Sequence, residues 1–154
     1  MIRGKSFSLG LAAMAVVFGV VAVSPVLAHK GAQGVVKQRM KEMGRMEKRL
    51  RLLKMMVQGK APFNAKAVRE RAATLHRHAQ RIPELFPPGT HKHPSEASPA
   101  IWQHFDDFRQ RAEQLDKAAI VLGKATKQTL PHALRQVQAA CKGCHERYRI
   151  ERKD

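Results

Sequence analysis

The chain has 154 residues, which suits one domain and leaves little room for two. Its 29 Lys and Arg residues outnumber its 12 Asp and Glu residues, so that the formal net charge is +17 at pH 7. This charge suggests an anionic partner, which could be nucleic acid, a membrane surface or an acidic protein. The basic residues are dispersed along the chain, and most of them are therefore expected to form a solvated surface.

Residues 1–28 have the pattern of a secretion signal. Two basic residues precede an apolar run at residues 9–23, and Val26-Leu27-Ala28 offers the small or tolerated residues that signal peptidase requires. An uncleaved membrane anchor is the alternative, but a membrane-spanning helix needs about 20 apolar residues and this run is shorter. We therefore expect cleavage after Ala28.

The mature domain would then be residues 29–154. The signal contains Arg3 and Lys5 and no acidic residue, so that its removal lowers the net charge from +17 to +15. Export to the periplasm argues against nucleic acid as the partner, and loss of the signal argues against stable membrane insertion. The charge therefore predicts an acidic protein as the partner.

The first predicted helix spans residues 34–60, and Gly59 and Pro62 end it. Arg39 is the charged member of its buried stripe, and a buried charge is costly unless it is paired. An alternative is that Arg39 extends its guanidinium to solvent. The stripe consists of two series with a spacing of seven residues, the a/d pattern of a bundle helix: Val36, Met43, Leu50 and Val57, and Arg39, Met46 and Leu53.

The second predicted helix spans residues 65–82. Asn64 is its expected N-cap, because the Asn side chain can accept a hydrogen bond from a free backbone N–H of the first turn. Pro83 ends this helix or closes its last turn. Residues 84–98 contain Pro87-Pro88-Gly89 and Pro94, and they are therefore predicted to form a loop.

The third predicted helix has Ser98 as N-cap and Pro99 in the first helical position, and it ends near Gly123. The fourth runs from about Thr129 to about Arg152. Four helices joined by mostly short links, with no strand pattern, predict an all-α fold, an antiparallel four-helix bundle.

Cys141-Lys142-Gly143-Cys144-His145 fits C-x-x-C-H, the attachment signature of c-type haem. Residues three apart share one face of a helix, so that both thiols can reach the two vinyl groups on one edge of a porphyrin. Attachment there brings His145, the next residue, to the iron as a strong nitrogen ligand. The chain has two cysteines, so no other cysteine competes to pair with them. We therefore predict one covalent haem c on the last helix.

Other interpretations of the cysteine pair fit the chain less well. A thioredoxin-like redox centre belongs with a βαβ pattern, which the sequence lacks. A zinc site needs two further ligands at suitable spacing, and the remaining His residues are scattered or lie in loops. A plain disulfide in an oxidising compartment stays open, and the chain would then be a basic exported binding protein.

A four-helix bundle with C-x-x-C-H on its last helix resembles the class II cytochromes c, the cytochrome c′ family. The resemblance covers residues 34–152. His145-Glu146-Arg147-Tyr148-Arg149 is similar to the family's closing pattern, in which a basic residue follows the ligand His by four positions. Met40, where Gln is common, and the high positive charge depart from the family. Further similar stretches are RMKEMGRM at 39–46, IPELFPPG at 82–89, and IW at 101–102 with FDDF at 105–108.

The resemblance implies roles for three further residues. Met43 aligns with the residue that faces the iron opposite the histidine, which is bulky and unbound in pentacoordinate members and an iron-binding Met in low-spin members. Arg39 aligns with an Arg close to a haem propionate, which would pair its buried charge. Arg149 aligns with a basic residue beside the haem near His145. A homodimer through the first two helices is also implied.

The resulting hypothesis is a periplasmic one-electron carrier, not an enzyme, with one low-spin haem whose axial ligands are His145 and Met43. A Met opposite a His is an established ligand pair in cytochromes c and raises the reduction potential. The alternative is a pentacoordinate cytochrome c′ that binds nitric oxide or carbon monoxide. The bond between the Met43 sulfur and the iron separates the two hypotheses, because a saturated sixth position leaves no place for a gas.

Overall fold

The computed structural model of the chain describes residues 32–150. The expected signal sequence, its cleavage point after Ala28 and the residues from 151 onward lie outside this part. Two short elements, η1 (Pro83–Leu85) and α3 (Ala100–Gln103), connect the second and third of four long helices. The long helices are α1 (Gly34–Val57), α2 (Ala65–Arg81), α4 (Phe105–Gly123) and α5 (Leu130–Tyr148).

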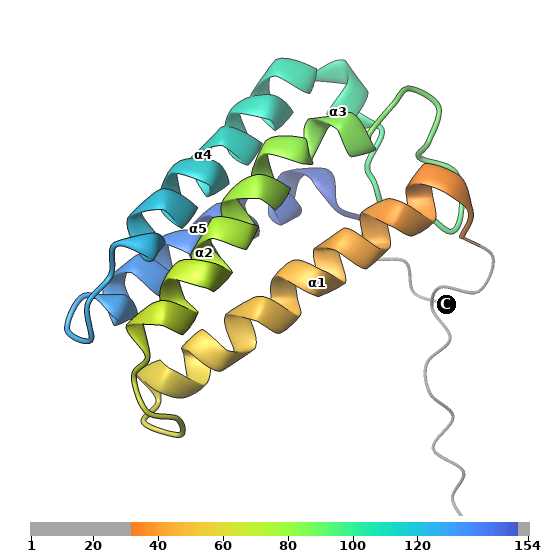
Figure 1. Ribbon diagram of the computed structural model, residues 1–154. Coiled ribbons are helices and arrows are strands. Elements are labelled where there is room, and N and C mark those ends of the chain that lie inside the picture. The colour runs from red at the N-terminus through yellow and green to blue at the C-terminus, as the bar shows by residue number, and fades with distance from the viewer. Residues whose placement is uncertain (1–31, 151–154) are drawn as a thin grey trace, which may run out of the picture.

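The four long helices form an antiparallel bundle (Figure 1). Each runs opposite to the one before it, and α2 packs most extensively against α4, as α4 does against α5. The contact between α1 and α5 is the smallest among neighbouring long helices, although these two helices close the bundle. The predicted all-α four-helix bundle is therefore confirmed, and its least filled side lies between its first and last helices.

The core is formed by one apolar stripe from each long helix. Burying such a side chain stabilises the fold by about 1.5–3 kcal/mol. Aromatic residues gather around Phe108, whose ring centroid lies 4.7 Å from that of Phe86 and 5.4 Å from that of Tyr148. The few aromatic side chains thus fill the end of the bundle where α5 terminates. Fully buried members of the core include Leu53, Val68, Leu75, Leu122 and Val137.

One predicted helix cap is confirmed by a hydrogen bond, and a second helix begins one residue later than predicted. The Asn64 Oδ1 accepts from the backbone N–H of Ala67 at 2.9 Å, which satisfies a free donor of the first turn of α2. The N-cap of α3 is Pro99 instead of the predicted Ser98, although the Ser98 Oγ accepts from the backbone N–H of Ala100 at 3.2 Å. The local sequence therefore sets where these helices begin.

The first helix ends earlier than predicted, at Val57 instead of residue 60. Gly59 adopts a φ of +71°, a left-handed conformation that glycine tolerates at a helix end. The Lys60 N–H then bonds back to the Met55 carbonyl at 2.8 Å and closes the helix. Val57 is 39% exposed, so that its predicted place in the buried stripe is wrong.

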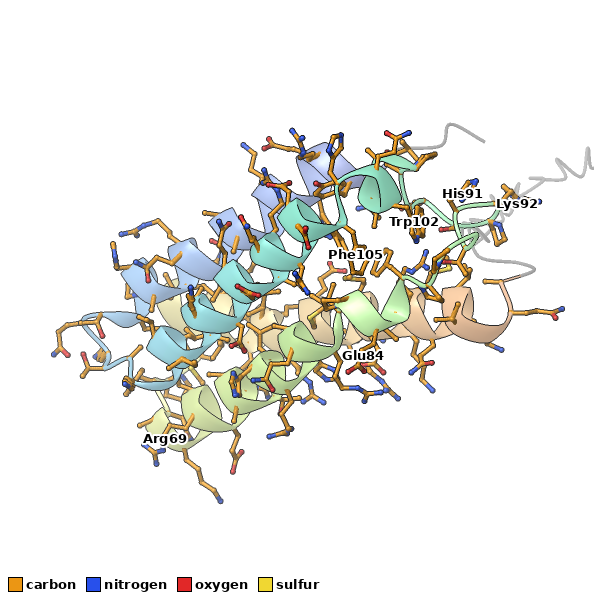
Figure 2. The ribbon with its side chains drawn as sticks, turned by 90° about the horizontal axis from the view of Figure 1, so that it is seen from above. Arg69, Glu84, His91, Lys92, Trp102 and Phe105 are labelled. Carbon is orange, nitrogen blue, oxygen red and sulfur yellow. The ribbon has the colours of Figure 1, made fainter. Side chains whose placement is uncertain are left out.

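The third predicted helix is interrupted. His104 has φ −131° and ψ 47°, which separates α3 from α4. The break lets α3 dock on the preceding loop, where the Trp102 Nε1 donates to the Phe86 carbonyl at 2.9 Å. Trp102 also lies beside His91, with ring centroids 5.4 Å apart (Figure 2). A continuous helix was predicted because the apolar spacing carries no signal for this docking.

The last helix ends at Tyr148, before the predicted residue Arg152. Arg149 is extended, with φ −109° and ψ 130°, and pairs with Ala97 in an isolated antiparallel bridge. The Ser98 N–H bonds to the Tyr148 carbonyl and the Ile150 N–H to the Glu96 carbonyl, both at 2.9 Å. The chain after α5 is thereby attached to the segment that precedes α3.

None of the helices between residues 32 and 150 has both the length and the apolar character that crossing a membrane requires.

Candidate functional site

The C-x-x-C-H sequence lies near the end of α5. Cys141 and Cys144 are both half-buried and pack against the hydrophobic core, whereas Lys142 between them is 76% exposed. This follows from the helical period, because residues three apart share a face and the intervening residue points elsewhere. Both thiols are free. The helix therefore presents two thiols side by side at the edge of the core, as predicted.

Burial keeps these thiols protonated. It raises the pKa of Cys144 to about 11, with Arg111 acting in the opposite direction, and it raises the pKa of Cys141 as well. Lys54 of α1 partly offsets the rise at Cys141, which shows that α1 lies near this thiol. A reactive or zinc-binding cysteine needs a depressed pKa, so this environment does not favour either role.

His145 is exposed and lines a hollow of about 400 Å³ together with Lys142, Glu146 and Arg149. The neighbouring protein atoms displace water from part of the ring and lower the pKa of His145, Arg149 lowers it further, and Glu96 raises it. The neutral imidazole, the form that binds iron, is thereby favoured. The bundle does not enclose the imidazole, and the hollow leaves space beside it for a bound group.

On the neighbouring helix α1, Met43 lies one turn after Arg39. Met43 is half-buried and packs against the edge of the core, as do Val35 and Met56 of the same helix. Ala140 and the two cysteines of α5 are likewise half-buried apolar residues that pack against the core. Since α1 and α5 contact each other less than the other neighbouring long helices do, and both carry half-buried apolar residues, the residues present fit a flat apolar group such as a haem.

Arg39 is only 5% exposed, which confirms that this charge lies in the buried stripe of α1. Its Nε and Nη2 donate to the Leu85 carbonyl at 3.1 and 2.9 Å. Its Nη1 donates to the Ser95 Oγ at 2.8 Å and the Thr90 carbonyl at 3.2 Å, and its Nη2 donates to the Thr90 Oγ1 at 2.7 Å. The guanidinium carbon lies 3.9 Å from the centre of the Phe86 ring, a cation–π contact.

These contacts give each of the five guanidinium N–H groups an acceptor within the protein. The proposed alternative of a solvent-exposed guanidinium is therefore wrong, and the buried charge is compensated by the loop of residues 85–95. Burial lowers the pKa of Arg39 to about 10, which leaves it charged at neutral pH. The pairing of Arg39 with a propionate stays a prediction, and the structure supplies a second reason for an arginine here.

Arg149 lies beside His145 in the hollow described above. Its Nε donates to the Glu96 Oε2 at 2.6 Å, which fixes the side chain to the segment before α3. The family resemblance implies a basic residue near the ligand histidine, and Arg149 lies near His145 in the structure. Its role toward a haem stays a prediction.

A cluster of hydrogen-bonded side chains on α4 and α5, next to the cysteines, was not predicted from the sequence. The Arg111 Nη1 donates to the Gly143 carbonyl at 2.9 Å, and the Arg111 Nε donates to the Asp107 Oδ2 at 2.8 Å. The Tyr148 hydroxyl donates to the same Asp107 oxygen. The spacing of four between Asp107 and Arg111 indicates a helical ion pair, but nothing local points to Gly143.

A four-helix bundle with two free thiols and a histidine in C-x-x-C-H spacing on its last helix defines a c-type haem protein. The sequence profile of cytochrome c′ matches residues 34–149. Cytochrome c-554 of Cereibacter sphaeroides is 36% identical over 146 residues, which cover 89% of this chain and 95% of that protein. Cytochrome c-556 of Agrobacterium fabrum is 33% identical over 124 residues, or 79% of this chain and 84% of that one.

Solved structures of cytochromes c′ have a fold similar to that of this chain. A nitric oxide complex of a mutant cytochrome c prime from Alcaligenes xylosoxidans superimposes with a TM-score of 0.70 at 26% identity, covering 77% of this chain and 94% of that chain. The chain therefore belongs to the cytochrome c′ family, as the resemblance implied, and its cofactor is covalently bound haem c.

Proposed function

We propose that this chain is an exported periplasmic cytochrome that transfers single electrons and does not act as an enzyme. Cys141 and Cys144 would hold one haem through thioethers, and His145 and Met43 would be its axial ligands. The observation that carries the proposal is that Met43 of α1 and both cysteines of α5 are half-buried and pack against the same core, on the two neighbouring long helices that contact each other least. Export rests on the signal pattern of residues 1–28.

Bound haem supplies a one-electron iron couple whose potential depends on its axial ligands and its burial. Cys141 and Cys144 would hold the ring on α5, because two attachment points prevent rotation. His145 follows Cys144 directly and is held near neutral charge by its surroundings, which suits an iron ligand.

Met43 is proposed as the sixth ligand because of its chemistry and its position. A thioether is neutral and soft, so that it suits ferrous iron and needs no deprotonation. Met43 follows Arg39 by one turn, and the five hydrogen bonds of Arg39 hold this part of α1 against the loop of residues 85–95. A ligand on a fixed helix loses little freedom on binding.

The second candidate function is the binding of nitric oxide or carbon monoxide at an open sixth position. It is favoured by the nitric oxide complex of the mutant cytochrome c prime to which this chain is similar. An optical spectrum of the purified protein, oxidised and reduced, with and without carbon monoxide, separates the two functions. A low-spin spectrum unchanged by carbon monoxide supports the electron carrier, and a high-spin oxidised spectrum supports gas binding.

We expect the haem to stay with the protein under denaturing conditions, because thioether bonds survive unfolding. Denaturing gel electrophoresis followed by a haem stain should give a band near the mass of residues 29–154. Replacing both Cys141 and Cys144 by alanine should abolish the stained band, while Cys144→Ala alone leaves one possible attachment. Extraction of all the haem of the unsubstituted protein into acidified organic solvent would contradict covalent attachment.

We also expect electron transfer from an acidic protein to depend steeply on salt, because dispersed surface Lys and Arg residues attract an anionic partner. Reduction by an acidic flavodoxin should slow by about tenfold or more between low and physiological ionic strength. Reduction by an uncharged small reductant serves as the control and should change little. Equal salt dependence of the two reactions would argue against an acidic partner.

A homodimer through α1 and α2 stays a prediction.

A further inference from the structure

Arg111 connects α4 to the turn that carries the cysteines. Its Nη1 donates to the carbonyl of Gly143, which lies between Cys141 and Cys144 in the chain, at 2.9 Å. The side chain is 26% exposed, so that protein covers most of it. A helical carbonyl normally accepts from the N–H four residues later, and a side chain that reaches it from another helix fixes the two helices to each other.

Asp107 holds the guanidinium of Arg111 in this orientation. Its Oδ2 accepts from the Arg111 Nε at 2.8 Å and from the Tyr148 hydroxyl, and it lies 3.3 Å from the Arg147 Nε. Tyr148 is only 3% exposed and its hydroxyl also lies 3.3 Å from the His104 carbonyl. The Arg111 guanidinium is therefore bonded to the Asp107 carboxylate of its own helix and to the Gly143 carbonyl of α5.

The positive charge of Arg111 also lies close to Cys144. The Arg111 Nη1 lies 2.9 Å from the carbonyl oxygen of Gly143, the residue that directly precedes Cys144, so that the positive charge is held beside the attachment residues. A haem attached at Cys144 would lie within the same field. One added electron lowers the charge of the iron from +3 to +2, with no proton transferred, and a nearby fixed cation favours the less positive state.

We propose that Arg111 is a positioning residue for the haem-attachment turn, which it binds through the Gly143 carbonyl, and that its positive charge raises the reduction potential of the haem. This inference rests on the proposed attachment of haem at Cys141 and Cys144. Asp107 both orients Arg111 and opposes its electrostatic effect, because the carboxylate favours the ferric state.

The test is a redox titration of the purified haem-loaded protein with substitutions on α4. Arg111→Met should shift the equilibrium toward ferric iron by roughly threefold to tenfold, which lowers the potential by about 28–59 mV for one electron. Asp107→Asn should shift it in the opposite direction. Arg109→Met is the matched control, since Arg109 donates to Asp106 at 2.8 Å on the exposed surface of the same helix, and its shift should be under about twofold.

Hydrogen exchange of the haem-loaded protein measures the positioning role independently of the potential. Residues 141–148 should exchange faster in Arg111→Met than in Arg109→Met, because only the former loses the bond to Gly143. Arg111→Lys should keep most of the potential, since it retains the charge.

Equal potentials in Arg111→Met and Arg109→Met, or shifts of the same sign in Arg111→Met and Asp107→Asn, would overturn the electrostatic role. Unchanged exchange would overturn the positioning role. Failure of the haem stain in the unsubstituted protein would instead contradict the proposed attachment, so that the two failures are distinguishable.

Discussion

Replacing Met43 by alanine is expected to convert the haem from low-spin to high-spin and to open it to carbon monoxide and nitric oxide. The reason is that alanine has no sulfur to occupy the sixth position. The reduction potential should fall, because a thioether opposite a histidine stabilises ferrous iron. Optical spectra before and after addition of carbon monoxide, with a redox titration, measure all three effects.

Two other methionines of α1 provide controls for the loss of a side chain. Met46 is 7% exposed, so that Met46→Ala should leave the spin state unchanged and lower the free energy of unfolding by about 2–5 kcal/mol. Met56 resembles Met43 in being half-buried at the edge of the core, and Met56→Ala should leave the spin state unchanged as well. An unsubstituted protein that is already high-spin when oxidised would exclude Met43 as ligand and favour the gas-binding function.

Replacing Arg39 by leucine is expected to lower the free energy of unfolding by about 2–4 kcal/mol. The substitution removes five hydrogen bonds and leaves the Leu85 carbonyl and the Ser95 Oγ without this donor in a buried site. It also removes the cation–π contact with Phe86. Denaturant unfolding of the haem-loaded protein measures the change.

Arg51→Leu is the matched control, since Arg51 lies on the same helix, carries the same charge and is exposed. Its effect on unfolding should be within about 0.5 kcal/mol. A redox titration of both variants tests the propionate separately: a larger shift of the potential in Arg39→Leu supports a propionate contact, and equal shifts leave the loop of residues 85–95 as the partner of Arg39. Equal stability of the two variants would contradict a stabilising role of Arg39, whether its partner is the loop of residues 85–95 or a propionate.

The attachment sequence and the helix starts could be predicted because their causes lie within a few residues. Asn64 caps α2 through a hydrogen bond that spans three residues, and Ser98 bonds to the N–H of the first residue of α3, two residues away. The spacing of three between Cys141 and Cys144 places both thiols on one face of any helix that contains them. The repeat of seven in the first helix likewise identified Arg39, Met46, Leu50 and Leu53 as buried.

The partners of the buried charges could not be predicted in this way. Arg39 reaches the Leu85 carbonyl 46 residues away and the Ser95 Oγ 56 residues away, so that its acceptors exist only after the loop has folded onto α1. A propionate was the partner that the family resemblance offered, and no periodicity in the sequence indicates a loop carbonyl. The same holds for Arg111, which bonds to Gly143 across 32 residues.

The sequence by itself therefore determined the helical bundle, the face of α5 that bears the two thiols, and the family to which the chain belongs. Short-range periodicity and a five-residue motif carry this information. Only the tertiary structure decided where the third helix breaks, why the last helix ends at Tyr148 and which groups surround Arg39 and Arg111. These outcomes depend on hydrogen bonds between segments far apart in the chain, and such bonds form only where packing brings a donor and an acceptor within reach.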